Sequence, residues 1–203
     1  MKTLTILLIL INLAFASTSI YDIKSEGEQI GTLSVQTKTL ANNQKEYKTH
    51  LKISIDSFLF SYHYVYKENA LFDAEGLLRF KVEESDDGEK KSMSAKREGG
   101  KLLFSNGKEI LLTHIDVTPF DMDDNANYKN NIKKFTLKSF DGLTGDLVDE
   151  MYVEEENLKM EGQIYKVFEK KNSFNDEVEK LYISEDGELK KVVGNDFEML
   201  HRN

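Results

Sequence analysis

From Ser19 onward, apolar and polar side chains alternate with a period of two, which is typical of β-strands. Residues 47–56 show this most clearly, with one face formed by Tyr47, Thr49, Leu51, Ile53 and Ile55. The phase then changes, and a second face carries a stripe of aromatic residues, Phe58, Phe60, Tyr62, Tyr64 and Tyr66. A shift of one residue reverses which side of a strand points inward, so we expect a bulge or a sharp bend at Asp56–Ser57.

Short turn signals separate the alternating runs. Most contain a glycine after an acidic residue, and Asn106–Gly107 is the strongest hairpin signal because both residues tolerate a positive φ. About ten short strands with polar turns predict a mainly β protein. We expect an antiparallel curved sheet forming a half-barrel, with a closed barrel or a sandwich as alternatives that the pattern does not separate.

One segment, residues 114–133, breaks the alternation and is dominated by small and polar residues. Thr118 followed by Pro119 is typical of a helix N-cap and first helical position. We therefore predict one short helical insertion from Pro119 to Tyr128. In a β protein such an insertion often lies across a sheet or closes the mouth of a barrel.

The N-terminus has the three parts of an export signal. Lys2 is followed by an apolar run, Leu4 to Leu13, and then by Ala14–Phe15–Ala16, with small residues where a signal peptidase cleaves. We predict a signal peptide at residues 1–16 and a single β domain at residues 17–203. The protein would then be exported, to the periplasm or as a secreted protein. The apolar run is too short to span a membrane as a helix. The alternative to a signal peptide is a buried N-terminal helix.

Composition limits the classes of partner and of chemical site that we expect. The formal net charge is −9, which repels phosphate backbones, so we expect no nucleic acid partner. The chain has no cysteine, which excludes disulfides, thiolate metal sites and a cysteine nucleophile. No later stretch is apolar enough to cross a membrane, so we expect no transmembrane segment in the mature chain.

Several stretches resemble a family of exported bacterial proteins classed only as domains of unknown function. The resemblance rests on Tyr21–Ile23 with Gln29–Thr32, Tyr62–Glu68, Asp73–Leu78, Asp86–Gly88, Leu143–Gly145 and Tyr182–Leu189. Related exported families fold into a curved antiparallel sheet similar to that of periplasmic lipoprotein carriers, which hold acyl chains on the concave face under a helical lid. The resemblance implies that the Pro119 helix is such a lid, and it implies no catalytic residues.

The aromatic stripe is the main candidate binding site. Tyrosine combines a large apolar surface with a hydroxyl that needs a partner, which suits the lining of a groove for an acyl chain or a sugar. Phe58, Phe60, Tyr62, Tyr64 and Tyr66 are therefore the predicted ligand-binding residues. The alternative is that these rings only pack the core.

Other candidate chemistry is weaker. The acidic residues between Asp116 and Asn127 lack the glycine and the final glutamate of a calcium loop, which favours a solvated helix start. Histidines 50, 63, 114 and 201 have no zinc spacing, and Glu68 with Asp73 is only one of many conceivable carboxylate pairs for glycoside chemistry. No serine elbow, phosphate loop or dinucleotide motif is present, so we expect neither a cofactor nor a metal nor catalytic residues.

Two hypotheses remain open. In the first, the protein binds a hydrophobic or lipid-like ligand on the curved sheet, beneath the predicted helix. In the second, it is a structural or interaction protein of the cell envelope, with a filled core and a free strand edge or acidic surface that docks a partner protein. An envelope hydrolase is the third and weakest alternative.

Overall fold

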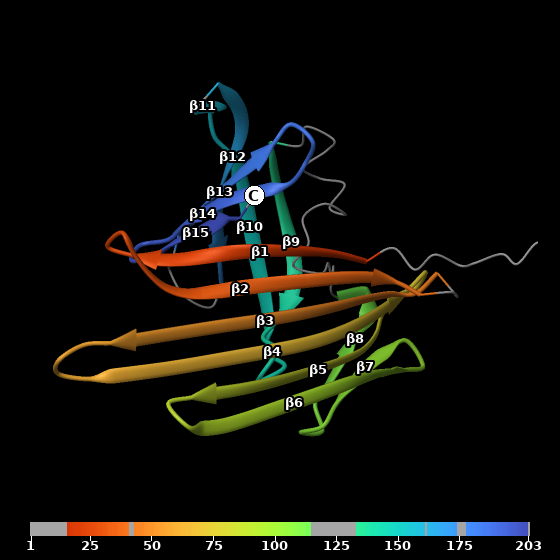
Figure 1. Ribbon diagram of the computed structural model, residues 1–203. Helices are drawn as coiled ribbons and strands as arrows, with labels where there is room; N and C mark the ends of the chain where they lie inside the picture. Colours follow the sequence, from red (N-terminus) through yellow and green to blue (C-terminus); the bar gives the residue numbers. More distant parts are fainter. Residues whose placement is uncertain (1–15, 41–42, 115–132, 161, 174–177, 203) are drawn as a thin grey trace, which may run out of the picture.

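Fifteen β-strands form one sheet in the computed structural model, which describes residues 16–40, 43–114, 133–160, 162–173 and 178–202 (Figure 1). Every strand pair is antiparallel, which confirms the prediction of a mainly antiparallel β protein. The strands are β1 (Ala16–Ser25), β2 (Glu28–Thr39), β3 (Lys45–Asp56), β4 (Ser61–Asp73), β5 (Gly76–Asp86), β6 (Glu89–Glu98), β7 (Lys101–Phe104), β8 (Glu109–Leu111), β9 (Lys134–Phe140), β10 (Leu147–Glu154), β11 (Leu158–Met160), β12 (Gln163–Asn172), β13 (Val178–Ser184), β14 (Leu189–Val193) and β15 (Glu198–His201).

The sheet consists of two meanders joined at their ends. Strands β1 to β8 lie side by side in chain order, as do β9, β10 and β12 to β15, while β11 pairs with β12 outside this order. The last strand returns to the first, with Tyr21 opposite His201. This pairing of β15 with β1 places both halves of the chain in a single curved sheet (Figure 1).

The longest hairpin joins β3 to β4. Its register places Tyr47 opposite Ala70 and Ile55 opposite Tyr62, so the two predicted apolar faces lie on the same side of the sheet. The bend predicted at Asp56–Ser57 is the turn of this hairpin, in which the Ser57 amide donates to the Phe60 carbonyl oxygen over 2.9 Å. The phase of the pattern changes because the chain reverses direction there.

The two outer strands, β8 and β9, are not paired with each other within the described residues, so no continuous ladder closes the sheet. Side chains bridge the gap instead. The Asn106 side-chain amide donates to the Thr144 carbonyl oxygen over 3.2 Å, and Lys108 lies 2.7 Å from Asp146. The ring of Phe140, at the end of β9, also packs edge-on against a ring from β7. The result is a strongly curved sheet whose open side is held together by side-chain contacts.

The buried apolar residues form two clusters. One consists of residues from β1, β2, β9, β10 and β12 to β15 and includes the fully buried Phe168 and Ile183. The other consists of residues from β3 to β8 and includes the fully buried Leu77, Val82 and Leu102. Two clusters rather than one leave space between them, and this space is the candidate site.

The remaining expectations concern the predicted helical insertion, the predicted signal peptide and membrane-spanning helices. The predicted helix at Pro119–Tyr128 and residues 1–15 of the predicted signal peptide lie outside them, and Ala16 is the first residue of β1. The described helical structure is a short 3-10 turn, η1 (Leu112–His114). In the described ranges, no helix has the length and apolar character needed to span a membrane.

Candidate functional site

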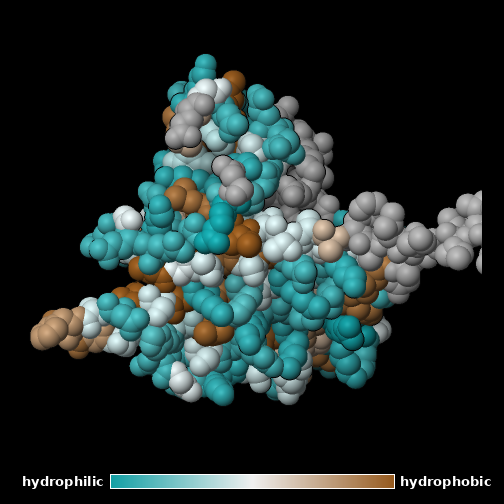
Figure 2. All heavy atoms as spheres, in the orientation of Figure 1, coloured by the Kyte–Doolittle hydropathy of each residue, from teal (hydrophilic) through white to brown (hydrophobic). Residues whose placement is uncertain are grey.

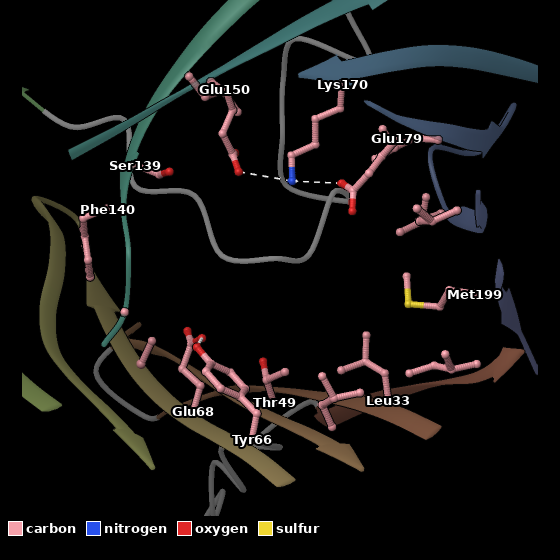
Figure 3. A pocket seen from close by; sticks show the side chains of 18 of the residues that line it. Leu33, Thr49, Tyr66, Glu68, Ser139, Phe140, Glu150, Lys170, Glu179 and Met199 are labelled. Carbon is pink, nitrogen blue, oxygen red and sulfur yellow. Dashed lines mark hydrogen bonds and ion pairs between the residues drawn. The ribbon is translucent and has the colours of Figure 1, made fainter. Parts of the chain in front are cut away.

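A cavity of about 560 Å³ lies on the concave side of the sheet, between the two core clusters. Its walls come from β1 to β5 on one side and from β9, β10 and β12 to β15 on the other (Figure 3). Most of the lining is aliphatic or phenylalanine, contributed by Ile23, Ile30, Leu33, Leu51, Ile53, Ala70, Phe72, Leu77, Phe80, Leu137, Phe140, Leu181, Leu189, Val192, Phe197 and Met199. Its volume is within the range of small-molecule sites.

The strand period explains why β3 contributes to this lining. Successive side chains of a strand point to opposite faces, so every second residue of β3 faces the concave side. Thr49, Leu51 and Ile53 line the cavity, whereas Lys48 and Lys52 lie on the other face and are exposed. The predicted division of this strand into an inner and an outer face is confirmed.

A tyrosine and a glutamate form a polar pair on the β4 wall of the cavity. The Tyr66 hydroxyl donates to Glu68 Oε2 over 2.8 Å, and both side chains line the cavity. Burial raises the pKa of Glu68, and the tyrosine hydrogen bond opposes this only in part. Burial and the adjacent Glu68 also raise the pKa of Tyr66. Because the hydroxyl proton of Tyr66 is already donated to Glu68, the pair offers a ligand hydrogen-bond acceptors.

Three charged residues form an ion cluster on the opposite wall, which we define as Glu150, Lys170 and Glu179 (Figure 3). Lys170 Nζ lies 3.1 Å from Glu150 Oε1 and 3.3 Å from Glu179 Oε2. The Tyr152 hydroxyl donates to Glu150 Oε2 over 3.0 Å. Burial lowers the pKa of Lys170, but the two carboxylates outweigh this effect and hold the pKa above its ordinary value. Lys170 is thus a fixed ammonium group.

The residues of the aromatic stripe do not stay together. Of the five, Tyr66 lines the cavity. Tyr62 and Tyr64 continue the same face of β4 toward the turn, and the Tyr64 hydroxyl donates to Glu84 Oε2 on β5 over 2.8 Å. Phe58 and Phe60 belong to the turn between β3 and β4, outside the cavity lining.

The turn itself forms a hairpin tip, which we define as Phe58, Leu59 and Phe60. Phe58 is fully exposed, Leu59 is 87% exposed and Phe60 is 59% exposed. The pairing of β3 with β2 ends at Ile53, and that of β4 with β5 begins at Tyr64, so the end of the hairpin projects past both neighbours. Figure 2 shows an apolar protrusion where Figure 1 places this hairpin.

The other candidate residues from the sequence do not converge. Asp73 binds Arg97, whose Nη1 donates to Asp73 Oδ1 over 2.9 Å, and does not accompany Glu68 in the cavity lining. His63 Nδ1 lies 2.9 Å from Ser54 Oγ on β3. The acidic segment Asp116–Asn127 lies outside the described residues. Over the described ranges, no group of three or more histidine and carboxylate side chains is arranged to hold a metal ion.

The sequence interpretation missed the ion cluster, although a signal for it exists. Glu150 lies between Val148 and Tyr152 on the buried face of β10, and Lys170 follows Phe168 on the buried face of β12. A charged residue at an inward position of an alternating run is rare unless it is paired or functional. A search for inward-facing charges of opposite sign on neighbouring predicted strands would have identified the cluster.

Comparison with known proteins places the chain in a family. Residues 21–196 match the family model described as a domain of unknown function (DUF6134). Among solved structures, the chain is similar to the β-barrel-like protein of the domain of unknown function DUF1849 from Brucella abortus. The TM-score is 0.63 at 15% sequence identity, with 91% of this chain and 94% of that chain covered, which shows a shared fold. The search of curated proteins finds no match. Because the family model covers most of the chain, the protein belongs to the DUF6134 family of domains of unknown function.

Proposed function

We propose that this protein binds a small apolar or amphipathic molecule, lipid-like in character, in the cavity on the concave side of the sheet. The observation that carries the proposal is the cavity itself, about 560 Å³ in volume with a mostly apolar lining. Ligand sites in proteins have this character, with a few polar groups that orient the bound molecule. Here those groups are the Tyr66–Glu68 pair and the ion cluster.

Burial of apolar surface provides the driving force. Each Å² of apolar ligand surface removed from water contributes roughly 25 cal/mol, which favours a ligand with a hydrocarbon body over a sugar or a peptide. The polar groups lie on two facing walls, so a purely apolar ligand would remove water from them without offering a partner for their remaining hydrogen-bonding capacity. An amphipathic ligand satisfies both parts of the lining.

A cavity-filling variant tests the proposal. Thr49 lines the cavity from β3, so Thr49→Phe places a ring inside the space that the ligand needs. A neutral fluorescent probe with an apolar body is expected to bind the wild-type protein at one site, and to bind Thr49→Phe at least tenfold more weakly. The chain has no tryptophan, so the probe signal has little protein background.

The control is Ser92→Phe, which adds the same ring at an exposed position of β6, outside the cavity. It is expected to bind the probe as the wild-type protein does. Equal binding by wild type, Thr49→Phe and Ser92→Phe would show that the probe binds elsewhere and would refute the cavity as the binding site. Circular dichroism and urea unfolding establish that each variant is folded.

We also propose that the protein functions after export, in the periplasm or outside the cell, on the basis of the predicted signal peptide at residues 1–16. Fractionation of the native host followed by mass spectrometry of the N-terminus tests this. The expected result is a chain that begins at Ser17 in an exported fraction. A cytoplasmic chain that retains Lys2 and the apolar run after it would contradict the proposal.

A second candidate function, recognition of a partner protein in the cell envelope, is favoured by the hairpin tip. Three consecutive exposed apolar side chains on a projecting turn fit an apolar pocket on another protein, and such patches mark interaction sites. A photo-crosslinking residue at Leu59, incorporated in living cells, is expected to join one discrete partner. The same residue at exposed Glu185 is the control. Absence of protein crosslinks specific to Leu59 would remove this candidate.

A further inference from the structure

We infer that the cavity selects ligands whose polar head is a hydrogen-bond donor or a cation, and that it rejects carboxylate and phosphate heads. This inference rests on the proposed function, because it specifies the chemistry of the molecule that the same cavity holds. It names a ligand class of an apolar chain bearing an ammonium, amine or hydroxyl group.

The charge inventory of the lining is the first argument. Within the described part of the chain, the side chains that line the cavity include three carboxyl groups, Glu68, Glu150 and Glu179, and one basic group, Lys170. A carboxylate ligand would therefore enter a space that already has an excess of acidic groups. Repulsion between like charges is strong in a site that is poorly exposed to water.

The second argument is that Lys170 is already occupied. Its ammonium lies within 3.3 Å of carboxylate oxygens from both Glu150 and Glu179, so the cluster as a whole has one negative charge in excess. For an anionic head to bind Lys170, it would have to displace one of these partners and leave that carboxylate in the cavity without its counter-ion, which is costly. A cationic head instead offers the excess carboxylate a second partner.

The third argument concerns the facing wall. Glu68 accepts a hydrogen bond from Tyr66 at one oxygen and retains further acceptor capacity for a donor on the ligand. The neutral polar groups of the lining, Thr49, Ser139 and Tyr152, add no positive charge. No described wall of the cavity thus supplies a free cation, and selection against anions follows from the whole lining.

Three amphiphiles with the same ten-carbon chain test the inference: decylammonium, decanol and decanoate, used at pH 7 below their aggregation concentrations. Each competes with the neutral fluorescent probe for the wild-type protein. Decylammonium is expected to bind most tightly and decanol next. Decanoate is expected to bind about tenfold or more weakly than decylammonium, because like charges repel strongly at the low effective dielectric of such a site. The titrations use 0.15 M salt, which screens the general surface charge beyond about 8 Å.

Glu179→Gln identifies the source of the selectivity. This variant leaves one carboxylate and one ammonium in the cluster, so the preference for decylammonium over decanoate is expected to fall severalfold. Glu185→Gln makes the same charge change at an exposed turn and is expected to keep the wild-type preference. Because Glu179→Gln retains the shape of the side chain, circular dichroism is expected to be unchanged, and Glu150→Gln provides an independent second variant.

The outcomes separate the inference from the proposed function. Equal binding of all three amphiphiles, or tightest binding of decanoate, would overturn the head-group inference while leaving the cavity as a ligand site. A preference for decylammonium over decanoate that keeps its wild-type size in both Glu179→Gln and Glu150→Gln would overturn the second argument, which assigns part of the selection to the excess charge of the ion cluster. Failure of all three amphiphiles and of the probe to bind would instead reject the proposed function.

Discussion

Removal of the lysine from the ion cluster is the perturbation whose size follows most directly from the structure. Lys170→Met keeps a long unbranched side chain but leaves Glu150 and Glu179 without their shared counter-ion. Breaking a buried ion pair by removing one partner costs about 3–5 kcal/mol. The three side chains are 19%, 23% and 30% exposed, so solvent screens part of this cost. We expect a loss of about 2–3 kcal/mol in the free energy of unfolding at pH 7.

The loss depends on pH with a definite sign. In the wild-type protein Glu150 and Glu179 hold the pKa of Lys170 above its ordinary value, so the folded chain retains this proton to a higher pH than the unfolded chain does. The stabilisation by Lys170 is therefore complete at pH 7 and is lost as the pH rises through the raised pKa of Lys170. The deficit of Lys170→Met relative to wild type is therefore expected to be smaller at pH 11, above the ordinary lysine pKa of 10.5, than at pH 7.

Thermal and urea unfolding at both pH values measure these quantities. For a chain of this size, a loss of 1 kcal/mol lowers Tm by roughly 2–4 °C, so Lys170→Met is expected to lower Tm by about 4–12 °C at pH 7. Lys159→Met, at an exposed position of β11, is the control and is expected to stay within about 0.5 kcal/mol of wild type. A Lys170→Met protein as stable as wild type at pH 7, or a deficit that does not shrink at pH 11, would refute the reasoning about the cluster.

Three further predictions concern other parts of the molecule. Burial raises the pKa of Glu68, so ionisation of this carboxyl group destabilises the fold as the pH rises. Glu68→Gln is therefore expected to raise Tm at pH 8 and to leave Tm nearly unchanged at pH 4. A lower Tm of the variant at pH 8 would contradict this. At Gly145 (φ +69°) an added Cβ would lie 3.1 Å from the Phe104 ring. Urea unfolding of Gly145→Ala is therefore expected to show a loss of about 1–3 kcal/mol in the free energy of unfolding. The loss in Gly107→Ala is expected to be smaller, because the added Cβ there meets open space. Replacing the whole hairpin tip by serine is expected to change the free energy of unfolding by less than about 0.5 kcal/mol, since these side chains are exposed, and a larger loss would show that the tip packs against the fold.

The elements of the fold could largely be predicted from the sequence. Alternation along residues 47–56 separates inner from outer side chains because a strand has a period of two, and Asn106–Gly107 forms the predicted hairpin turn. The pairing of β15 with β1 could not be predicted, since no local pattern encodes which distant strands meet. The curvature and the cavity depend on that pairing.

The candidate site could be predicted only in part, for two physical reasons. The turn between β3 and β4 contains Phe58, Leu59 and Phe60 instead of the usual glycine or asparagine. Because these residues are apolar, the alternating pattern assigned Phe58 and Phe60 to the face of a strand although they belong to the turn. In addition, a local pattern shows which side chains point inward but not whether the opposing wall fills the space between them. Tyr66 lines the cavity, whereas the paired charges around Lys170 depend on contacts between three strands.

The most direct test of the cavity as a ligand site is native mass spectrometry of the protein purified from its native host under mild conditions. The account predicts that the wild-type protein and Ser92→Phe carry a single small-molecule adduct, that organic extraction removes it, and that Thr49→Phe lacks it. A mass equal to that of the bare polypeptide in all three proteins, or an adduct that persists in Thr49→Phe, would contradict the claim that the cavity holds a ligand.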